Sequence, residues 1–186
     1  ATAQNIIKTG AGTMILAPTG SYHNYNGTTT IKAGTLVLGA NAPSGSAGAL
    51  GNATSAVLLG DTTGSSDASL IINGAYTMAR AITVQSGNTG TITIGGTGAN
   101  SAVFSGNITL NKSATLTADA GGTVTFQTGA ISGTGFGITK AGDGTVVLSG
   151  TNTYTGNTTV NAGTLSISGK IYSGLNGSGP IVTVNS

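Results

Sequence analysis

A stretch that runs from Lys140 to Leu165 decides the fold of this chain, and it reads KAGDGTVVLSGTNTYTGNTTVNAGTL. A second stretch near the start follows the same plan, with KTGAGTMIL from Lys8 and YNGTTTIKAGTL from Tyr25. In both, a lysine precedes glycines and a short apolar run, and a tyrosine precedes a threonine-rich run that ends in AGTL. Recurrence of one plan is typical of proteins whose units stack on their neighbours. We therefore expect residues 1–186 to be one segment of a longer repeat protein, with copies at 8–38 and 140–167 and divergent coils between them.

The two copies differ in the length of one turn. The interval from Lys8 to Tyr25 is longer than the interval from Lys140 to Tyr154, because the early copy has three additional residues before its tyrosine. A surface turn tolerates such a change, and a core strand does not. We predict that Pro18–Asn24 is a surface turn and the first place to look for a specific contact.

The residues between the copies predict short strands. The chain contains 33 glycines and 38% hydrophobic residues, and apolar residues, many of them valine or isoleucine, alternate with threonine or serine. Glycine and β-branched residues disfavour helix, and alternation with period two favours half-buried strands. The expected strands are Ser55–Leu59, Ala68–Ile72, Ala81–Val84, Thr91–Ile94, Ala102–Phe104, Asn107–Leu110, Ala114–Thr117 and Thr123–Phe126, with a further strand-like run at Ile181–Val184.

Many short, evenly spaced strands fit either a β-solenoid or a sandwich or barrel. Glycine- and asparagine-rich turns provide the repeated corners of a solenoid, and outward threonine, serine and asparagine side chains can stack as ladders between coils. We therefore expect an all-β solenoid. At about 20 residues per coil it would have roughly nine coils and, at ~4.8 Å per coil, a length on the order of 45 Å.

The stretch from Lys140 to Leu165 resembles the passenger-associated transport repeat, also called the autotransporter-associated β-strand repeat. The resemblance covers nearly every position of that stretch, and the early copy departs from it at Ala17, Pro18 and the longer turn. The resemblance implies a right-handed parallel β-helix in a secreted or surface-anchored bacterial protein. It also implies a role for the repeats in export of the passenger.

These observations lead us to expect a structural stalk or fibre segment at the bacterial cell surface, not an enzyme. An adhesive module that binds glycans or another surface through its threonine-, asparagine- and serine-rich face is the alternative. The expected partners of this chain are neighbouring solenoid segments. We expect head-to-tail association into filaments, because exposed strand edges pair.

Composition argues against several other classes of protein. Only 5% of residues are charged and the net charge is +2, with the basic residues scattered singly, so no patch is expected to bind nucleic acid. Cysteine is absent, which excludes disulfides and thiolate metal sites. No apolar run approaches the ~20 residues that span a bilayer as a helix.

Few side chains in the sequence are able to carry chemistry. Asp61 and Asp67 are the only acids near one another, and we interpret them as turn residues. Asp119 and Asp143 stand beside glycines, and the early copy has alanine where the late one has Asp143. Hydrolysis of glycosidic bonds requires paired carboxylates. His23 is the single histidine and has no acid nearby in the sequence.

We therefore predict no catalytic residue, no cofactor and no metal site. Tyr25 and Tyr154 are expected to pack over turns.

Overall fold

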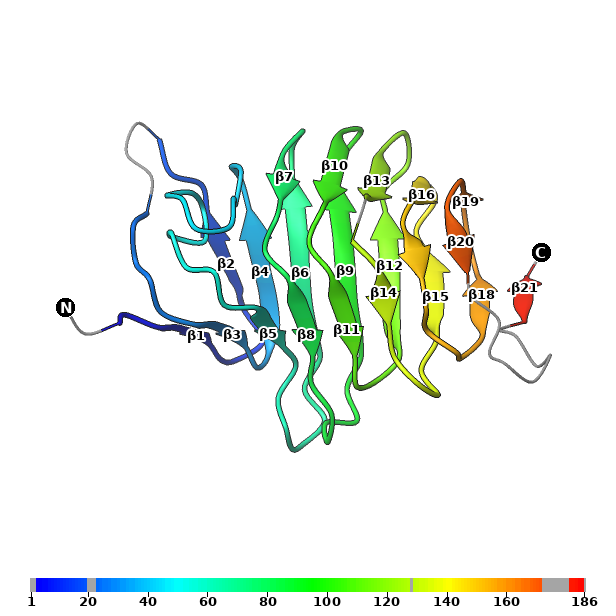
Figure 1. Ribbon diagram of the computed structural model, residues 1–186, viewed down its shortest axis with the longest axis horizontal. Helices are drawn as coiled ribbons and strands as arrows, with labels where there is room; N and C mark the ends of the chain where they lie inside the picture. The colour runs from blue at the N-terminus through cyan, green and yellow to red at the C-terminus, as the bar shows by residue number, and fades with distance from the viewer. Residues whose placement is uncertain (1–2, 20–22, 128, 172–180, 186) are drawn as a thin grey trace.

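The computed structural model describes residues 3–19, 23–127, 129–171 and 181–185, and these residues form a β-solenoid. All the pairings between their named strands are parallel, and the described residues contain no helix, so none of them forms a helix that could cross a membrane. The coils follow one another along the long axis, from blue at one end to red at the other (Figure 1). The prediction of an all-β parallel solenoid is confirmed.

Three parallel sheets form the stack, and the chain visits them in turn. Only sheet B runs the whole length, because sheet C has no named strand in the first two coils and sheet A has none in the last. Sheet A contains β1 (Ile6–Lys8), β3 (Thr29–Ile31), β5 (Val57–Leu59), β8 (Ile82–Val84), β11 (Ile108–Leu110) and β14 (Ile131–Ser132). Sheet B contains β2 (Thr13–Leu16), β4 (Gly34–Leu38), β6 (Ala68–Asn73), β9 (Ile92–Thr97), β12 (Ala114–Ala118), β15 (Ile138–Ala141), β18 (Thr158–Val160) and β21 (Val182–Val184). Sheet C contains β7 (Thr77–Met78), β10 (Ser101–Phe104), β13 (Thr123–Phe126), β16 (Thr145–Leu148) and β19 (Thr164–Ile167). A separate pair joins β17 (Thr151–Asn152) to β20 (Lys170–Ile171).

The described part of the chain makes about seven turns, so the prediction of nine coils is wrong. The length of a coil can be counted from a residue of sheet B to its register partner in the next strand of that sheet. Most coils have similar lengths, but the coil from Thr35 to Ser69 is much longer than the others. This long coil contains the irregular segment 39–56 between β4 and β5. Seven turns at ~4.8 Å give a stack about 34 Å long.

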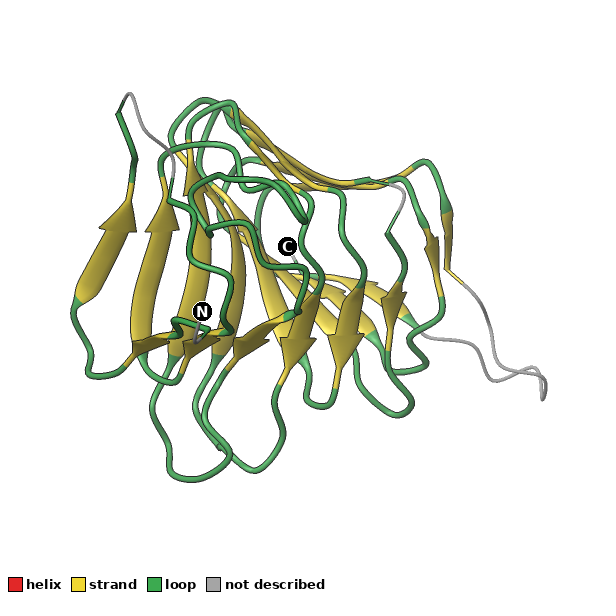
Figure 2. Cartoon of the chain, turned by 60° about the vertical axis from the view of Figure 1, so that its left-hand side comes forward, coloured by secondary structure: helices red, strands yellow, loops and turns green. Residues whose placement is uncertain are grey.

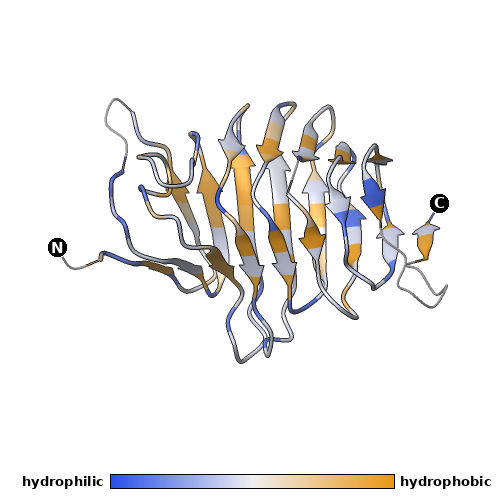
Figure 3. Ribbon diagram, viewed as in Figure 1, coloured by the Kyte–Doolittle hydropathy of each residue, from blue (hydrophilic) through white to orange (hydrophobic). Residues whose placement is uncertain are grey.

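Strands and turns alternate around each coil (Figure 2), and apolar and polar residues alternate along the strands (Figure 3). The buried side chains of the strands are mainly apolar. Each strand predicted between the copies is present, with ends shifted by up to three residues, and Ile181–Val184 contains β21. In sheet A the inward column of Ile31, Leu59, Val84 and Leu110 is almost fully buried. Burial of each such side chain stabilises the fold by about 1.5–3 kcal/mol.

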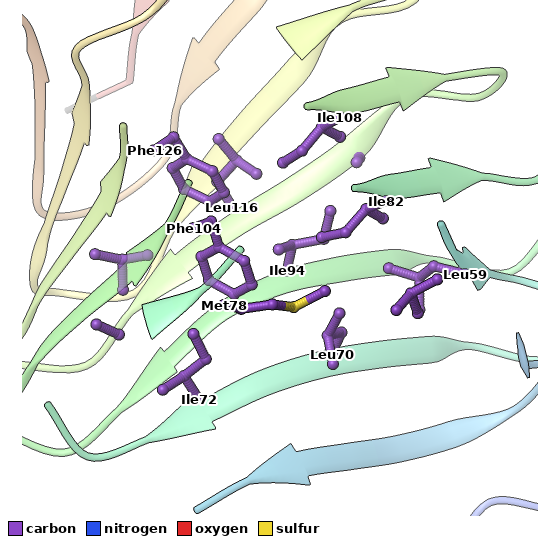
Figure 4. Close-up of a cluster of buried hydrophobic side chains, with 14 of the residues drawn as sticks. Leu59, Leu70, Ile72, Met78, Ile82, Ile94, Phe104, Ile108, Leu116 and Phe126 are labelled. Carbon is purple, nitrogen blue, oxygen red and sulfur yellow. The ribbon is translucent and has the colours of Figure 1, made fainter. Parts of the chain in front are cut away.

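The rings of Phe104 and Phe126 from neighbouring coils stack in the same core, with centroids 5.1 Å apart and planes 9° from parallel. Figure 4 shows these rings beside Met78 and Leu116, so side chains from sheets B and C meet in one continuous interior. The turn predicted at Pro18–Asn24 lies partly outside the described residues, because residues 20–22 are not described.

Candidate functional site

The lysine of the late repeat copy is buried in the core. Lys140 occupies an inward position of sheet B, in register with Leu116 on one side and Val160 on the other, and it is 0% exposed. Its Nζ donates hydrogen bonds to the carbonyl oxygens of Ala141, Gly142 and Ala162, at 2.9, 2.6 and 3.0 Å. Burial lowers the pKa of Lys140, and the nearby charge of Asp143 opposes that shift. The three carbonyls replace the water that the ammonium loses.

Lys8 makes the same set of contacts in the early copy. It is 7% exposed and is in register with Ile31. Its Nζ donates to the carbonyl oxygens of Thr9, Gly10 and Ala33, at 3.1, 2.6 and 2.9 Å. In both copies the ammonium thus joins the glycine turn of its own coil to the AGTL turn of the next coil.

The tyrosine and the first strand threonine of each copy form a second buried pair. Thr29 and Thr158 are 0% exposed, and each lies in register between an isoleucine and a valine. The hydroxyl of Tyr25 is 3.1 Å from Thr29 Oγ1, and that of Tyr154 is 2.6 Å from Thr158 Oγ1. Burial raises the pKa of both tyrosines, and the hydrogen bond to threonine opposes the rise.

The expectation that these tyrosines pack over turns is wrong for Tyr154, which lies fully buried in the core. Tyr25 is half-buried. A threonine hydroxyl in an apolar column requires a partner, and a tyrosine provides one together with its apolar ring.

Arg80 is the third buried cation and lies outside both copies. It is 1% exposed, and burial lowers its pKa. Its guanidinium donates to the carbonyl oxygen of Ser55 through Nε and Nη2, at 3.0 and 2.6 Å, and to that of Leu50 through Nη1 at 2.8 Å. It therefore holds the segment between β4 and β5 against the core.

The two repeat copies lie on different faces of the solenoid. In the early copy the lysine strand is β1 of sheet A and the next strand is β2 of sheet B. In the late copy the lysine strand is β15 of sheet B and the next is β16 of sheet C. The lysines of the two copies make the same hydrogen bonds although their strands belong to different sheets. The repeat therefore determines the local structure of one corner and of the two coils stacked there, but not the face of the solenoid on which it lies.

The acids cap turns in different parts of the structure. Asp61 accepts a hydrogen bond from the Thr62 amide, which lowers its pKa, and it pairs with Lys32 at 3.3 Å. Asp67 Oδ1 accepts from the Thr91 amide at 2.6 Å, and Asp119 Oδ2 accepts from the Gly98 amide at 2.9 Å. Asp143 is exposed.

Among the described residues no group of three histidine, aspartate or glutamate side chains forms a metal cage. His23 is exposed, and its ring lies 6.5 Å from that of Tyr25. The structure therefore does not bring the candidate acids and the histidine together.

An outward ladder of hydroxyl side chains runs along sheet B. One register column contains only threonine and serine: Thr13, Thr35, Ser69, Thr93, Thr115, Thr139, Thr159 and Thr183. The spacing between neighbouring hydroxyls follows that of the strands, ~4.8 Å. We name this column the hydroxyl ladder, and it is the most regular polar surface of the described residues.

The next outward column of sheet B is not regular. It changes from Ile15, Val37 and Ile71 at one end to Gly95 and Thr117 in the middle. Sheet B therefore carries one continuous column of hydroxyls, and the column beside it is not a second one.

The sequence pattern of a known family matches both copies. The family described as Passenger-associated-transport-repeat matches residues 6–38 and 138–167, which contain the buried lysines and tyrosines. Residues 6–38 and 138–167 are two passenger-associated transport repeats. No solved structure matches the chain.

A curated relative of this passenger-associated-transport-repeat chain is the adhesin BmaC autotransporter of Brucella suis biovar 1 (strain 1330). It is 38% identical over 155 residues, which are 83% of this chain and 4% of that protein. The chain thus spans a small part of the relative's length. It is a β-solenoid segment that contains two passenger-associated transport repeats, and it is homologous to part of an adhesin autotransporter.

Sequence reasoning missed the role of the polar residues in the passenger-associated transport repeats. The lysines were counted only as scattered charges, although both copies place a lysine two residues before a glycine. The signal in the sequence is a lysine at a position of the strand where the alternation of apolar and polar residues predicts a buried side chain. A buried ammonium needs several carbonyl partners, so such a lysine indicates a structural role.

Proposed function

We propose that this segment is a stalk in the passenger of a secreted or surface-displayed bacterial protein, and that its repeats assist export by stacking one coil on the next. The observation that supports a stalk is the parallel stack of about seven turns, in which sheet B is unbroken from β2 to β21 and sheets A and C lie beside it over most of that length. In such a stack each coil contacts only its neighbours, so stability accumulates along the axis.

The export part of the proposal is supported by the self-contained contacts of each repeat. Lys140 and its three carbonyls join two successive coils, as do Lys8 and its partners. A pair of coils joined in this way can form as soon as the repeat has left the membrane. Once folded, it opposes movement of the chain back through the pore.

The test removes one coil at a time from the parent protein. Deletion of residues 139–158 removes a coil with the repeat lysine and tyrosine, and it joins Ile138 to Thr159 in the register of sheet B. Deletion of 93–114 removes a coil without a repeat and joins Ile92 to Thr115 in the same way. We expect the first deletion to lower surface display and the second to leave it close to that of the parent. Equal display of the two would overturn the export role.

Recognition of a surface is the second candidate, and the hydroxyl ladder is the observation that favours it. Hydroxyl groups at a fixed spacing can donate to and accept from the hydroxyls of a glycan. A glycan array probed with the chain, and with a Thr35→Lys, Ser69→Lys variant that changes two neighbouring residues of the ladder, tests this candidate. We expect binding by the parent and loss of binding by the variant. An array without any bound glycan would end this proposal, and so would equal binding by both proteins.

Head-to-tail association is part of the proposal for partners. Strands at the ends of a stack present unpaired backbone groups, and such edges pair with other chains. Light scattering of this chain at increasing concentration is expected to show a growing mean molecular mass of the particles. A monomer at every concentration would contradict head-to-tail association.

A further inference from the structure

The corners between sheets A and B have unequal lengths, and this inequality forms a groove. Four residues (9–12) connect β1 to β2, two (32–33) connect β3 to β4, and eight (60–67) connect β5 to β6. Figure 1 shows the turn after β5 projecting beyond the stack. The short middle corner is the floor and its two neighbours are the walls. Since coils stack ~4.8 Å apart, the walls lie about 10 Å from each other.

We name this feature the corner groove. Its volume is about 470 Å³, within the range of small-molecule sites. The lining residues that matter for binding are Ala11, Ala33, Thr35, Ser66, Asp67 and Ser69. Thr35 and Ser69 also belong to the hydroxyl ladder, so the groove lies at the edge of that surface.

The floor of the corner groove is held in place from below. Lys8 Nζ donates to the carbonyl oxygens of Gly10 and Ala33, which joins one wall to the floor. The Gly34 amide donates to the Asp67 carbonyl oxygen at 2.8 Å, which joins the floor to the other wall. The repeat lysine therefore supports the groove, although it does not line it.

The long wall is braced by the next coil. Asn88 is 4% exposed, and its Nδ2 donates to the carbonyl oxygens of Thr63 and Ser66, at 3.3 and 3.1 Å. The Thr91 amide bonds to Asp67 Oδ1. A turn with these contacts is ordered before a ligand arrives, so binding costs less conformational entropy.

The chemistry of the lining selects a class of ligand. Hydroxyls of Thr35, Ser66 and Ser69 both donate and accept, and the carboxylate of Asp67 accepts, with no donor among the described residues on its Oδ2. No cation among the described residues lines the groove: the Lys8 ammonium is bonded to carbonyls beneath it, and Lys32 pairs with Asp61. An anion is therefore disfavoured. A neutral ring with several hydroxyls matches these groups, and the methyls of Ala11 and Ala33 can pack against its C–H face.

We propose that the corner groove binds one ring of a neutral saccharide. This inference rests on the recognition candidate above and gives it a defined site. The lining residues contain no aromatic ring on which a sugar would stack, so the affinity of a single groove is weak, and several copies of the parent acting together would supply avidity.

The test is an NMR titration of the 186-residue chain with methyl glycosides of glucose, galactose, mannose and N-acetylglucosamine at millimolar concentrations. We expect saturable shifts of the amides of residues 10–11, 33–35 and 66–69 with at least one sugar. Asp67→Asn retains the acceptor for the Thr91 amide and removes the charge, and Ser69→Leu fills the groove. Asp67→Asn is expected to weaken binding about tenfold, the loss of one charge-assisted hydrogen bond. Ser69→Leu is expected to weaken binding at least as much, because the leucine side chain takes the place of the sugar.

Thr109→Leu is the matched control, because Thr109 is an exposed threonine of sheet A that belongs neither to the corner groove nor to the hydroxyl ladder. It is expected to bind the sugar as the parent does, and unchanged spectra away from the groove show that each variant is folded. Saturable shifts along the hydroxyl ladder would overturn the groove and leave the recognition candidate standing. Shifts caused by a Ser/Gly peptide but by no sugar would overturn the ligand class. No shift with any probe would overturn the inference, while surface display would still test the stalk.

Discussion

Lys140 brings a positive charge into the core of a parallel stack, because three carbonyl oxygens take the place of water around its ammonium. The buried hydroxyls of Tyr154 and Thr158 also lack water, and they form a hydrogen bond with each other. Among the described residues every buried side-chain nitrogen or oxygen has a hydrogen-bond partner. The polar residues that define the repeat are therefore structural, and binding must be sought on the outward side chains.

Lys140→Met is expected to lower the free energy of unfolding by about 2–4 kcal/mol, because three carbonyls lose a charged donor. Urea unfolding followed by circular dichroism measures this loss. Lys170→Met is the control, since Lys170 is exposed, and a change within about 0.5 kcal/mol is expected for it. A Lys140→Met protein as stable as the parent would show that the hydrogen bonds from Lys140 to the three carbonyls do not stabilise the fold.

Tyr154→Phe is expected to cost about 1 kcal/mol at neutral pH, because it leaves the Thr158 hydroxyl without its partner. Burial raises the pKa of Tyr154, so above the unfolded pKa of ~10 the unfolded chain loses a proton that the folded chain keeps. The stability of the parent relative to the variant is therefore constant below that pH and declines as pH rises through the folded pKa.

Unfolding midpoints of parent and variant, measured in parallel from neutral to alkaline pH, check this dependence. The shift of Lys140 is common to both proteins and cancels in the difference. A difference that stays flat at high pH would show that the Tyr154 hydroxyl ionises as readily in the folded chain as in the unfolded one.

At the scale of elements, the corners decide how two coils fit together. Gly163 stands in the AGTL turn with φ of 64°, and a Cβ there would lie 2.4 Å from the carbonyl oxygen of Gly144 and 2.5 Å from that of Gly142. The corner thus requires glycine for its backbone conformation and for the close approach of the neighbouring coil.

Gly163→Ala is expected to destabilise the chain by about 1–3 kcal/mol. Gly12→Ala is the matched control in the glycine turn of the early copy, where no atom lies within 4 Å of the added Cβ. Thermal unfolding of both variants should show a lower midpoint for the first and almost no change for the second. Equal midpoints would mean that the AGTL corner relaxes without cost.

At the scale of the whole molecule, stability is expected to depend on the position of a strand in the stack. β9 and β12 have a partner on each side in sheet B, whereas β21 pairs only with β18 and has exposed side chains. Native-state hydrogen exchange of the whole chain should be slowest in β9 and β12 and fastest in β21, because an end strand opens without disturbing the rest. Uniform exchange rates along sheet B would indicate all-or-none unfolding instead.

The sequence predicted the strands of this solenoid well, since alternation of apolar and polar residues is a local property that each strand displays by itself. It overestimated the number of coils, because a uniform coil length does not account for the irregular segment 39–56 between β4 and β5. It also did not predict the corner groove, whose walls come from turns that lie far apart in the chain, at 9–12 and 60–67.

The sequence by itself determined an all-β repeat chain in which apolar residues alternate with outward threonine and serine, because strand period and glycine turns act within a few residues. It did not predict that Thr29 and Thr158 lie inside the core. Only the tertiary structure decided which sheet each repeat joins, where Lys140 is buried, and which turns meet at the corner groove. These features depend on contacts between successive coils, and the length of each turn, rather than its residue types alone, determines which residues of neighbouring coils come together.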